Sequence, residues 1–295
     1  MSERQALLRV MPAVFVMIWS TGFIVARFGM PYAPPMSFLA VRYALSVLCF
    51  LPWILLARVA WPNTRMQWLH LGVAGVLMHA MYLGGVWAAV KAGMGSGLSA
   101  LFVGLQPVLT GIWLSATGSR VTSRQWAGLL LGFLGLALVV SRKFGAGGEA
   151  NVLTLSLALL ALMGITVGTL YQKRFVAPCD VRSANAVQLA AAFVVTLPLA
   201  LLETEAMVWN AQLAGAMAWS VLALSLGGSS LLYLLIQRGA AASVSSLMYL
   251  VPPTTAVIAW MLFDEPITGI TLLGTGLTAL GVALVVRNPH RSPAA

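Results

Sequence analysis

Residues Gly128–Val140 read GLLLGFLGLALVV and residues Gly274–Val286 read GTGLTALGVALVV, so two glycines and a closing ALVV recur 146 residues apart. The same spacing relates Pro107 to Pro253, Thr122 to Thr268, and Arg27 to Lys173. An offset that persists this far upstream indicates an internal duplication. Many membrane transporters consist of two such apolar copies.

The composition places the chain in a membrane. Hydrophobic residues make up 60% of its 295 residues and charged residues only 8%. Soluble domains carry about 25% charged residues, so an ordinary water-soluble fold is excluded. A membrane-spanning helix needs about 20 apolar residues, and the runs do not alternate as the strands of a β-barrel do. The sequence therefore predicts an all-α integral membrane protein whose ten spans are Val10–Arg27, Met36–Ala57, Trp68–Val90, Ser96–Thr117, Gln125–Ser141, Val152–Gln172, Ser183–Leu202, Trp209–Gln237, Ser243–Phe263 and Thr268–Val286.

The duplication assigns five spans to each half, residues 10–142 and residues 152–287. Because five is odd, the second copy must enter the membrane in the opposite sense to the first. The sequence thus predicts two inverted five-helix repeats, related by an axis in the membrane plane.

The basic residues predict the orientation. If the N-terminus is cytoplasmic, twelve of the 17 Lys and Arg residues fall on the cytoplasmic side, and only Arg27, Lys91, Arg142 and Lys143 fall outside. The positive-inside rule then favours cytoplasmic N- and C-termini. The net charge of +10 describes a face towards anionic lipid headgroups, and it does not indicate nucleic-acid binding.

Groups for chemistry are scarce. The sequence has no H-E-x-x-H and no phosphate-binding loop, and its three histidines, at positions 70, 79 and 290, form no ligand cluster. No acidic residue falls within an expected span, so a carboxylate proton relay is not predicted. We expect no enzyme, no cofactor and no metal site.

Prolines interrupt two equivalent spans. Pro107 lies mid-way along the fourth span, and Pro252 and Pro253 lie mid-way along the ninth. Proline removes a backbone hydrogen bond and clashes with the preceding turn, so both helices should kink near the bilayer centre. Matched interruptions in two halves point to a transporter's binding site and gate, although a kink can also simply curve a packed helix.

Helical spacing places aromatic and polar side chains near these interruptions. The predicted substrate-binding residues share a mixed aromatic and polar character, as ligand pockets do; they are Trp19, His79, Tyr82, Phe102, Gln106, Ser245 and Tyr249. Structural alternatives remain open. His79 is more often a histidine bonded to a backbone carbonyl, Gln106 can bond across helices, and a deep tryptophan can serve packing alone.

Arg42 is the one basic residue well inside an expected span, six residues past Met36. A guanidinium at the bilayer centre costs about 2.5–3.5 kcal/mol on insertion scales. Its equivalent in the second half is the neutral Gln188. The sequence favours a structural role, bonding loop carbonyls near the outer surface, over binding a carboxylate.

Small residues predict close helix contacts. Gly128 and Gly132 are four residues apart in the fifth span, and so are Gly164 and Gly168 in the sixth. This spacing lets helix backbones approach. The fifth and tenth spans carry few polar side chains and are expected at the periphery, packed on each other or on a second subunit. The sequence leaves open a monomer or a homodimer.

Several segments resemble the drug/metabolite transporter superfamily. Ile18–Arg27 (IWSTGFIVAR) resembles its W-G-x-x-F-x-x-x-K/R opening, and Pro35–Tyr43 resembles its second-helix pattern. Phe263–Thr268 (FDEPIT), followed by Gly274 and Gly281, resembles its closing G-E-x-x-T…G…G-V pattern. The resemblance covers the whole chain as two EamA-type units. Ser119 departs from it, since the first unit often carries the glutamate seen here as Glu265.

Within the superfamily the chain is most similar to YddG-type exporters of aromatic amino acids. This resemblance implies an inner-membrane exporter of aromatic or hydrophobic amino acids, or related small metabolites, which works by alternating access through a central cavity. The alternative is a proton-coupled exporter of cationic drugs such as methyl viologen, with the same fold. The expected partners are a small-molecule substrate and membrane lipid.

Overall fold

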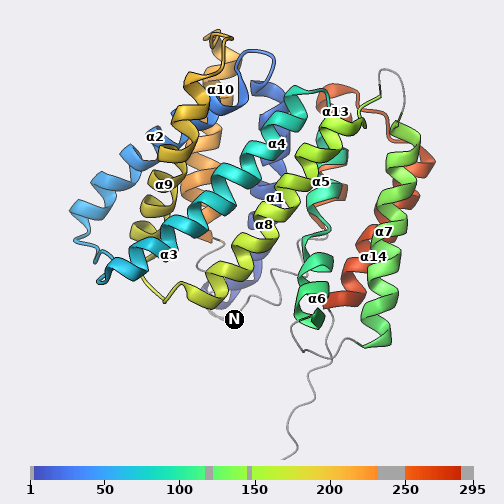
Figure 1. Ribbon diagram of the computed structural model, residues 1–295, viewed down its shortest axis with the longest axis horizontal. Helices are drawn as coiled ribbons and strands as arrows, with labels where there is room; N and C mark the ends of the chain where they lie inside the picture. The colour runs from blue at the N-terminus through green and yellow to red at the C-terminus, as the bar shows by residue number, and fades with distance from the viewer. Residues whose placement is uncertain (1–2, 117–121, 145–147, 232–249, 287–295) are drawn as a thin grey trace, which may run out of the picture.

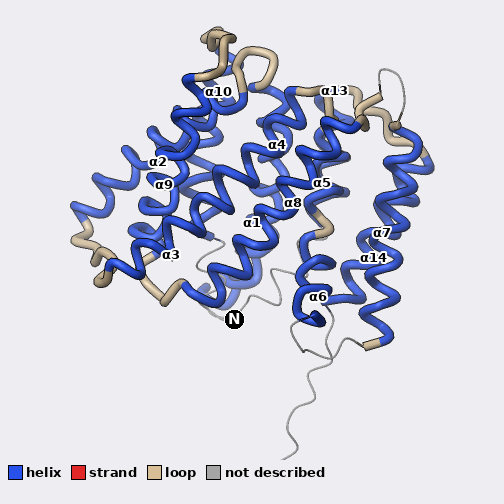
Figure 2. The backbone as a smooth tube through the Cα atoms, in the orientation of Figure 1, coloured by secondary structure: helices blue, strands red, loops and turns tan. Residues whose placement is uncertain are grey.

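The computed structural model describes residues 3–116, 122–144, 148–231 and 250–286, and these are helical apart from short connections (Figures 1 and 2). The α-helices are α1 (Glu3–Gly29), α2 (Pro35–Leu56), α3 (Arg65–Gly75), α4 (Tyr82–Lys91), α5 (Ser96–Val103), α6 (Gln106–Ala116), α7 (Ser123–Lys143), α8 (Val152–Phe175), α9 (Val181–Leu201), α10 (Ala211–Trp219), α13 (Val251–Phe263) and α14 (Gly269–Val286). Two π-helical segments, η1 (Val76–Met81) and η2 (Ser220–Gly228), continue α3 and α10.

The predicted all-helical membrane protein is confirmed. Within the described residues, seven helical stretches are long and apolar enough to cross a membrane, and three shorter apolar ones are Val14–Gly29, Val251–Phe263 and Gly269–Leu284. Each of the ten corresponds to a predicted span. Large apolar side chains such as Leu130, Leu134 and Leu201 are 60% or more exposed, as expected for helices whose outer face meets lipid rather than water.

The two π-helical segments occupy equivalent positions. Residues 76–81 of η1, moved along the chain by 146 positions, become residues 222–227 and fall inside η2. Neither segment is predicted by the sequence. π-Helical turns inside α-helices are frequently found at functional sites, so the matched pair marks a region of interest in both halves.

Equivalent helices also pack on each other. Helices α7 and α14, the fifth and tenth spans, lie side by side at one end of the molecule, and α2 and α9 pair at the other end (Figure 1). Of the two alternatives for the fifth and tenth spans, the structure therefore has them packed on each other. A Cβ atom added to Gly281 would lie 2.5 Å from the carbonyl oxygen of Gly128, so only glycine permits this approach.

The Gly164–Gly168 pair brings α8 against η1 and α4. A Cβ atom on Gly164 would lie 2.8 Å from the backbone nitrogen of Tyr82 and 2.9 Å from the carbonyl oxygen of Leu77. The predicted close contact of this glycine pair is thus present. It holds the first helix of the second half against the π-helical segment of the first half.

Candidate functional site

A cavity of about 70 Å³ lies among helices of both halves. Its walls come from α1, α2, η1, α4, α8, α9 and η2 and are mainly apolar and aromatic. They consist of Trp19, Gly22, Phe23, Arg42, Met78, His79, Tyr82, Leu83, Val86, Trp87, Ile165, Gln172, Asn185, Gln188, Leu224 and Ser229. Apolar walls with a few converging polar groups are typical of small-molecule sites.

The lining reflects the duplication. Four pairs of lining residues are 146 positions apart, namely Trp19 and Ile165, Arg42 and Gln188, Met78 and Leu224, and Leu83 and Ser229. Residues at equivalent positions of two repeats meet only close to the axis that relates the repeats. The cavity therefore lies where the two halves face each other, the usual place for a transporter's substrate.

A smaller pocket adjoins this cavity. The two share Trp19, Phe23, Tyr82 and Ile165, and the smaller one extends towards Gln106 and Pro107. Trp19 and Tyr82 thus lie on the boundary between the two pockets.

The structure brings together most of the described residues that the sequence singled out. Trp19, His79 and Tyr82 line the main cavity, and Gln106 lines the smaller pocket. Phe102 lines neither; it packs instead against the apolar cluster that includes Leu101 and Leu105. Ser245 and Tyr249 lie outside the described residues.

The structural alternatives for two of these residues have different outcomes. The Gln106 side-chain amide donates a hydrogen bond to Thr169 Oγ1 across α6 and α8, at 3.0 Å. For His79, the carbonyl oxygen accepts a hydrogen bond from the Tyr43 hydroxyl at 2.9 Å. The imidazole itself lines the cavity together with the side chain of Gln188.

The fourth span is broken close to Pro107, as the sequence predicted. Helix α5 ends at Val103, Gly104 and Leu105 form a turn, and α6 begins at Gln106, with Pro107 in its first turn. In the second half, α13 begins at Val251 with Pro252 and Pro253 in its first turn, where proline is tolerated.

The break in the fourth span faces the start of α13. A Cβ atom on Gly104 would lie 2.9 Å from Pro252 Cγ, so the turn of the first half packs directly on the proline of the second.

The expectation for Arg42 was wrong in its surroundings. Arg42 is 5% exposed and lines the cavity. Its Nε donates a hydrogen bond to Ser225 Oγ on η2 at 3.1 Å, rather than to loop carbonyls. Its guanidinium carbon lies 5.5 Å from the centre of the Trp87 ring, a distance at which a cation is attracted to the ring face. The nitrogen Nη1 is buried and has no hydrogen-bond partner.

Sequence reasoning missed the polar wall on α8 and α9. Gln172, Asn185 and Gln188 all line the cavity, and Gln188 donates a hydrogen bond to Gln172 at 3.1 Å. Polar residues on otherwise apolar spans were the available signal. The equivalence of Gln188 to Arg42 would have supported at least one of them.

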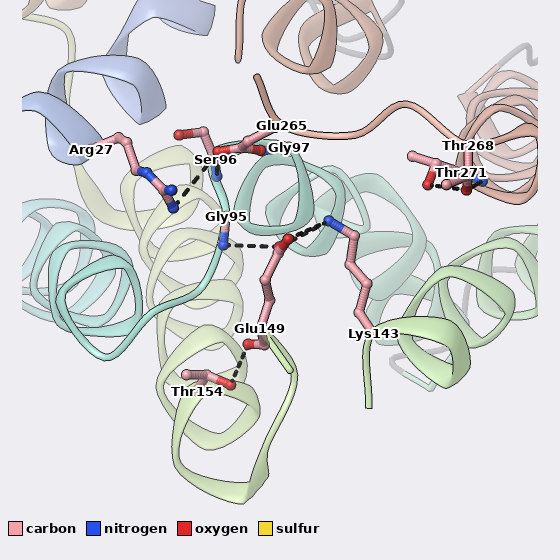
Figure 3. A network of polar contacts seen from close by, with 10 residues as sticks. All are labelled: Arg27, Gly95, Ser96, Gly97, Lys143, Glu149, Thr154, Glu265, Thr268 and Thr271. Atoms are coloured by element: carbon pink, nitrogen blue, oxygen red, sulfur yellow. Dashed lines mark hydrogen bonds and ion pairs between the residues drawn. The ribbon is translucent and has the colours of Figure 1, made fainter. Parts of the chain in front are cut away.

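A network of paired charges lies where α1 ends and α5 begins (Figure 3). Glu265 accepts hydrogen bonds from the backbone nitrogens of Ser96 and Gly97, at 3.0 and 3.3 Å, and lies 3.8 Å from Arg27. Glu149 accepts from the backbone nitrogen of Gly95 at 3.1 Å and pairs with Lys143 at 2.8 Å. Carboxylates are favourable at helix N-termini, so these two acids fix the start of α5. We call the contacts of Glu265 and Glu149 the α5 cap network.

The start of α2 is held in the same way. Glu203 accepts hydrogen bonds from the backbone nitrogens of Met36 and Ser37, at 2.8 and 2.7 Å, and Lys91 pairs with Glu205 at 2.6 Å. On the predicted cytoplasmic side, Asp180 caps α9. A hydrogen bond from Arg182 holds the pKa of the Asp180 carboxyl below its usual value.

The duplicated helical bundle and the cavity between its halves define a multi-pass membrane transporter. The chain belongs to the EamA-like transporter family, which it matches over residues 10–141 and again over residues 152–287. It is accordingly a transporter and not an enzyme.

Individual relatives span almost the whole chain. It is 26% identical over 279 residues to the "Uncharacterized inner membrane transporter YedA" of Escherichia coli (strain K12), covering 94% of this chain and 90% of YedA. It is 27% identical over 279 residues to the "Uncharacterized transporter YvbV" of Bacillus subtilis (strain 168), covering 92% and 89%. A "Probable amino-acid metabolite efflux pump" of Escherichia coli (strain K12) is 24% identical over 290 residues, covering 94% of each.

A solved structure described only as "Crystal structure of protein" has the same fold. It superposes with a TM-score of 0.63 at 18% identity and covers 96% of both chains. At this identity the likeness concerns the fold alone.

Proposed function

We propose that the protein is an inner-membrane exporter of aromatic or hydrophobic amino acids, or related small metabolites, and that it works by alternating access through the central cavity. In this proposal the units are residues 10–142 and 152–287, arranged as inverted repeats, with both termini in the cytoplasm. Substrate would contact Trp19, His79 and Tyr82, and Pro107, Pro252 and Pro253 would serve as hinges.

The observation that carries this proposal is the composition of the cavity wall. Trp19, Phe23, Tyr82 and Trp87 supply ring surfaces, and aromatic groups of a substrate pack well against such rings. His79 and the amides of α8 and α9 supply hydrogen bonds for a polar end. A small molecule with one apolar and one polar end matches this wall.

The pairing of helices supports an inverted repeat. Helix α1 packs on α13, and its counterpart α8 packs on α6, the counterpart of α13. Helix α9 is the counterpart of α2, and helix α14 is the counterpart of α7. Each of these helices packs on its own counterpart. This pattern is expected when a two-fold axis relates the repeats, and an odd number of helices per repeat requires that axis to lie in the membrane plane.

The α5 cap network supports a state that is closed towards the outside. With cytoplasmic termini, α1 ends and α5 begins on the outer side, where Glu265 joins Arg27 to the backbone of Ser96. The lining residues Gln172 and Asn185 lie near the cytoplasmic ends of α8 and α9. An exporter must bind its substrate from the cytoplasm in such a state.

Relatives give independent support of a coarser kind. One relative across nearly the full length is described as a probable amino-acid metabolite efflux pump. Its description agrees with the size and polarity of a solute that the cavity wall would suit.

The test is counterflow of radiolabelled tryptophan into proteoliposomes that contain the purified protein, with and without an imposed pH gradient. We expect saturable counterflow without the gradient. Flux that requires the gradient would turn attention to His79 as a proton site. Absence of tryptophan flux together with uptake of methyl viologen would overturn the amino-acid proposal in favour of the cation exporter.

A further inference from the structure

Arg42 is held at one edge and left free at the other. Its Nε is bound to Ser225 Oγ at 3.1 Å, and its guanidinium lies over the Trp87 ring. These two contacts fix the plane of the group. The nitrogen Nη1, at the far edge, is buried and has no hydrogen-bond partner. The side chain is thus oriented without being satisfied.

A second unsatisfied donor lies beside it. Trp87 is 1% exposed, lines the same cavity, and its indole Nε1 also has no partner. Guanidinium and indole N–H groups donate hydrogen bonds and cannot accept them. Two adjacent orphan donors therefore call for a ligand that accepts hydrogen bonds, and the positive charge of Arg42 calls for an anion.

The described part of the chain supplies no such anion. The chain has seven acidic residues, and none of them is among the residues that line the cavity. Four lie in the outer caps and pairs described above, and Asp180 pairs with Arg182. Asp264 is exposed at the end of α13.

The remaining acidic residue, Glu3, is far along helix α1 from Trp19, a lining residue of the cavity. Glu3 precedes Trp19 by 16 residues on the continuous helix α1, a distance of about 24 Å at the helical rise of 1.5 Å per residue. The segment 232–249, which lies outside the described residues, contains no Asp or Glu in its sequence. Among the described residues no side chain therefore supplies a counter-charge for Arg42, and a bound anion would supply it.

We infer that Arg42, with the Trp87 indole, binds the carboxylate of the transported molecule, and that the substrate class is monocarboxylates with an apolar or aromatic group. An ammonium group would find only neutral acceptors and ring faces in the described wall. The carboxylate is therefore required and an ammonium group is dispensable. The inference rests on the proposed function in so far as the cavity is the transport site.

Matched ligands that differ in one charged group test this requirement. Binding to the purified protein would be measured for L-phenylalanine, for 3-phenylpropionate, which lacks the ammonium, and for 2-phenylethylamine, which lacks the carboxylate. The corresponding indole and isobutyl series would be run alongside. Wild-type protein should bind both acids roughly 10- to 100-fold more tightly than the amine, because a hydrogen bond to a charged group is the main difference.

Three variants assign the effect to Arg42. Arg42→Gln, which introduces the residue found at the equivalent position of the second half, should reduce the preference for acids to less than about threefold. Arg42→Lys should keep part of it, because an ammonium is a point charge without the planar fork of arginine. Arg182→Gln is the matched control, since this arginine pairs with Asp180 away from the cavity, and it should retain the wild-type preference.

If Arg42 has a purely structural role, its substitution should change the affinity for all three ligands equally. The ratio of the affinities for acids and amine is therefore the deciding quantity. Thermal unfolding of each variant confirms that a folded protein is compared. Retention of the acid preference by folded Arg42→Gln would overturn the inference. Equal binding of the amine and the acids to the wild-type protein would also overturn it. Transport of the amines alone would overturn the inference too, but it would leave the cavity as a transport site.

An inorganic anion is the other source of the same chemistry. The measurements would be repeated with chloride replaced by gluconate. If chloride binds and competes only in proteins with Arg42, and organic acid binding is unchanged in Arg42→Gln, the counter-ion is inorganic and the inference fails. If no acid or amine of any series binds or moves, the proposed function and the inference fall together.

Discussion

Arg27 and Arg42 lie on the first two helices of the chain, but their environments are opposite. Arg27, whose side chain is 36% exposed, lies 3.8 Å from the Glu265 carboxylate and 5.6 Å from the centre of the Phe263 ring. Arg42 is almost fully buried and has a hydroxyl and an indole ring beside it instead of a carboxylate. The protein pairs the more exposed charge with a carboxylate and leaves the buried one without a carboxylate partner among the described residues.

In the proposed function, Arg27 belongs to the contacts that close the outer end of the helices, and Arg42 belongs to the contacts that recognise the substrate. A buried unpaired charge is costly in a membrane and is retained where function needs it. A paired charge at a helix end stabilises that end. We therefore expect changes in the α5 cap network to alter stability and changes around Arg42 to alter selectivity, and four substitutions can break or sharpen the contrast.

Glu265→Ala should have the largest effect. It removes the acceptor for two backbone N–H groups of α5 and leaves Arg27 without its partner. We expect a loss of about 2–4 kcal/mol in unfolding free energy, as for a helix cap combined with charged hydrogen bonds. Thermal unfolding in detergent measures it. The matched control is Asp264→Asn. This neighbouring position is exposed and has a left-handed backbone, which asparagine tolerates. An equal loss of unfolding free energy there would contradict the role of the network.

Arg42→Met should act in the opposite direction. Removal of a buried unpaired charge is expected to leave the unfolding free energy unchanged or to raise it by up to about 2 kcal/mol. The same thermal unfolding measurement applies. A destabilisation as large as that of Glu265→Ala would mean that Arg42 serves the fold, and the contrast between the two arginines would be lost.

Tyr82→Ala should reduce counterflow of tryptophan by about tenfold, because both pockets lose a ring on which the proposed substrate would pack. Tyr82 is only 4% exposed, so flux must be normalised to the amount of folded protein. Tyr82→Phe keeps the ring and should retain most of the flux. Unchanged flux in folded Tyr82→Ala would remove this residue from the site.

Glu205→Ala should have the smallest effect. The Glu205 side chain is 61% exposed in its pair with Lys91, and exposed ion pairs contribute about 0–1 kcal/mol. We expect a change in melting temperature within the scatter of the wild type and a weak dependence on salt. A large loss would show that the outer pairs act as one unit with the α5 cap network.

Much of the fold could be predicted because the membrane restricts the choices. Backbone groups cannot remain unsatisfied in lipid, so each apolar run of sufficient length becomes a helix. Pro107 likewise predicts the break between α5 and α6, and Pro252 and Pro253 lie in the first turn of α13. The π-helical segments carry no proline and gave no comparable signal in their sequences.

The site could be predicted only in part. Trp19, His79 and Tyr82 follow from aromatic and polar spacing on helices of the first half. Phe102 lines neither pocket, because residues on one helical stripe need not face the same neighbour once the helix is broken at Gly104. Gln172 and Asn185 were missed because the direction of a single polar residue on an apolar helix depends on how that helix is rotated against its neighbours.

The sequence by itself determined the duplication, the helical membrane fold and the depth of Arg42 along its helix, because all three depend on spacing and hydrophobicity along the chain. Only the tertiary structure decided what Arg42 meets. Its partner Ser225 is 183 residues away, and the absence of a carboxylate from the cavity wall depends on which faces of distant helices are turned inward. Lateral packing of the helices, rather than any local pattern, turns an arginine in a span into a candidate binding group.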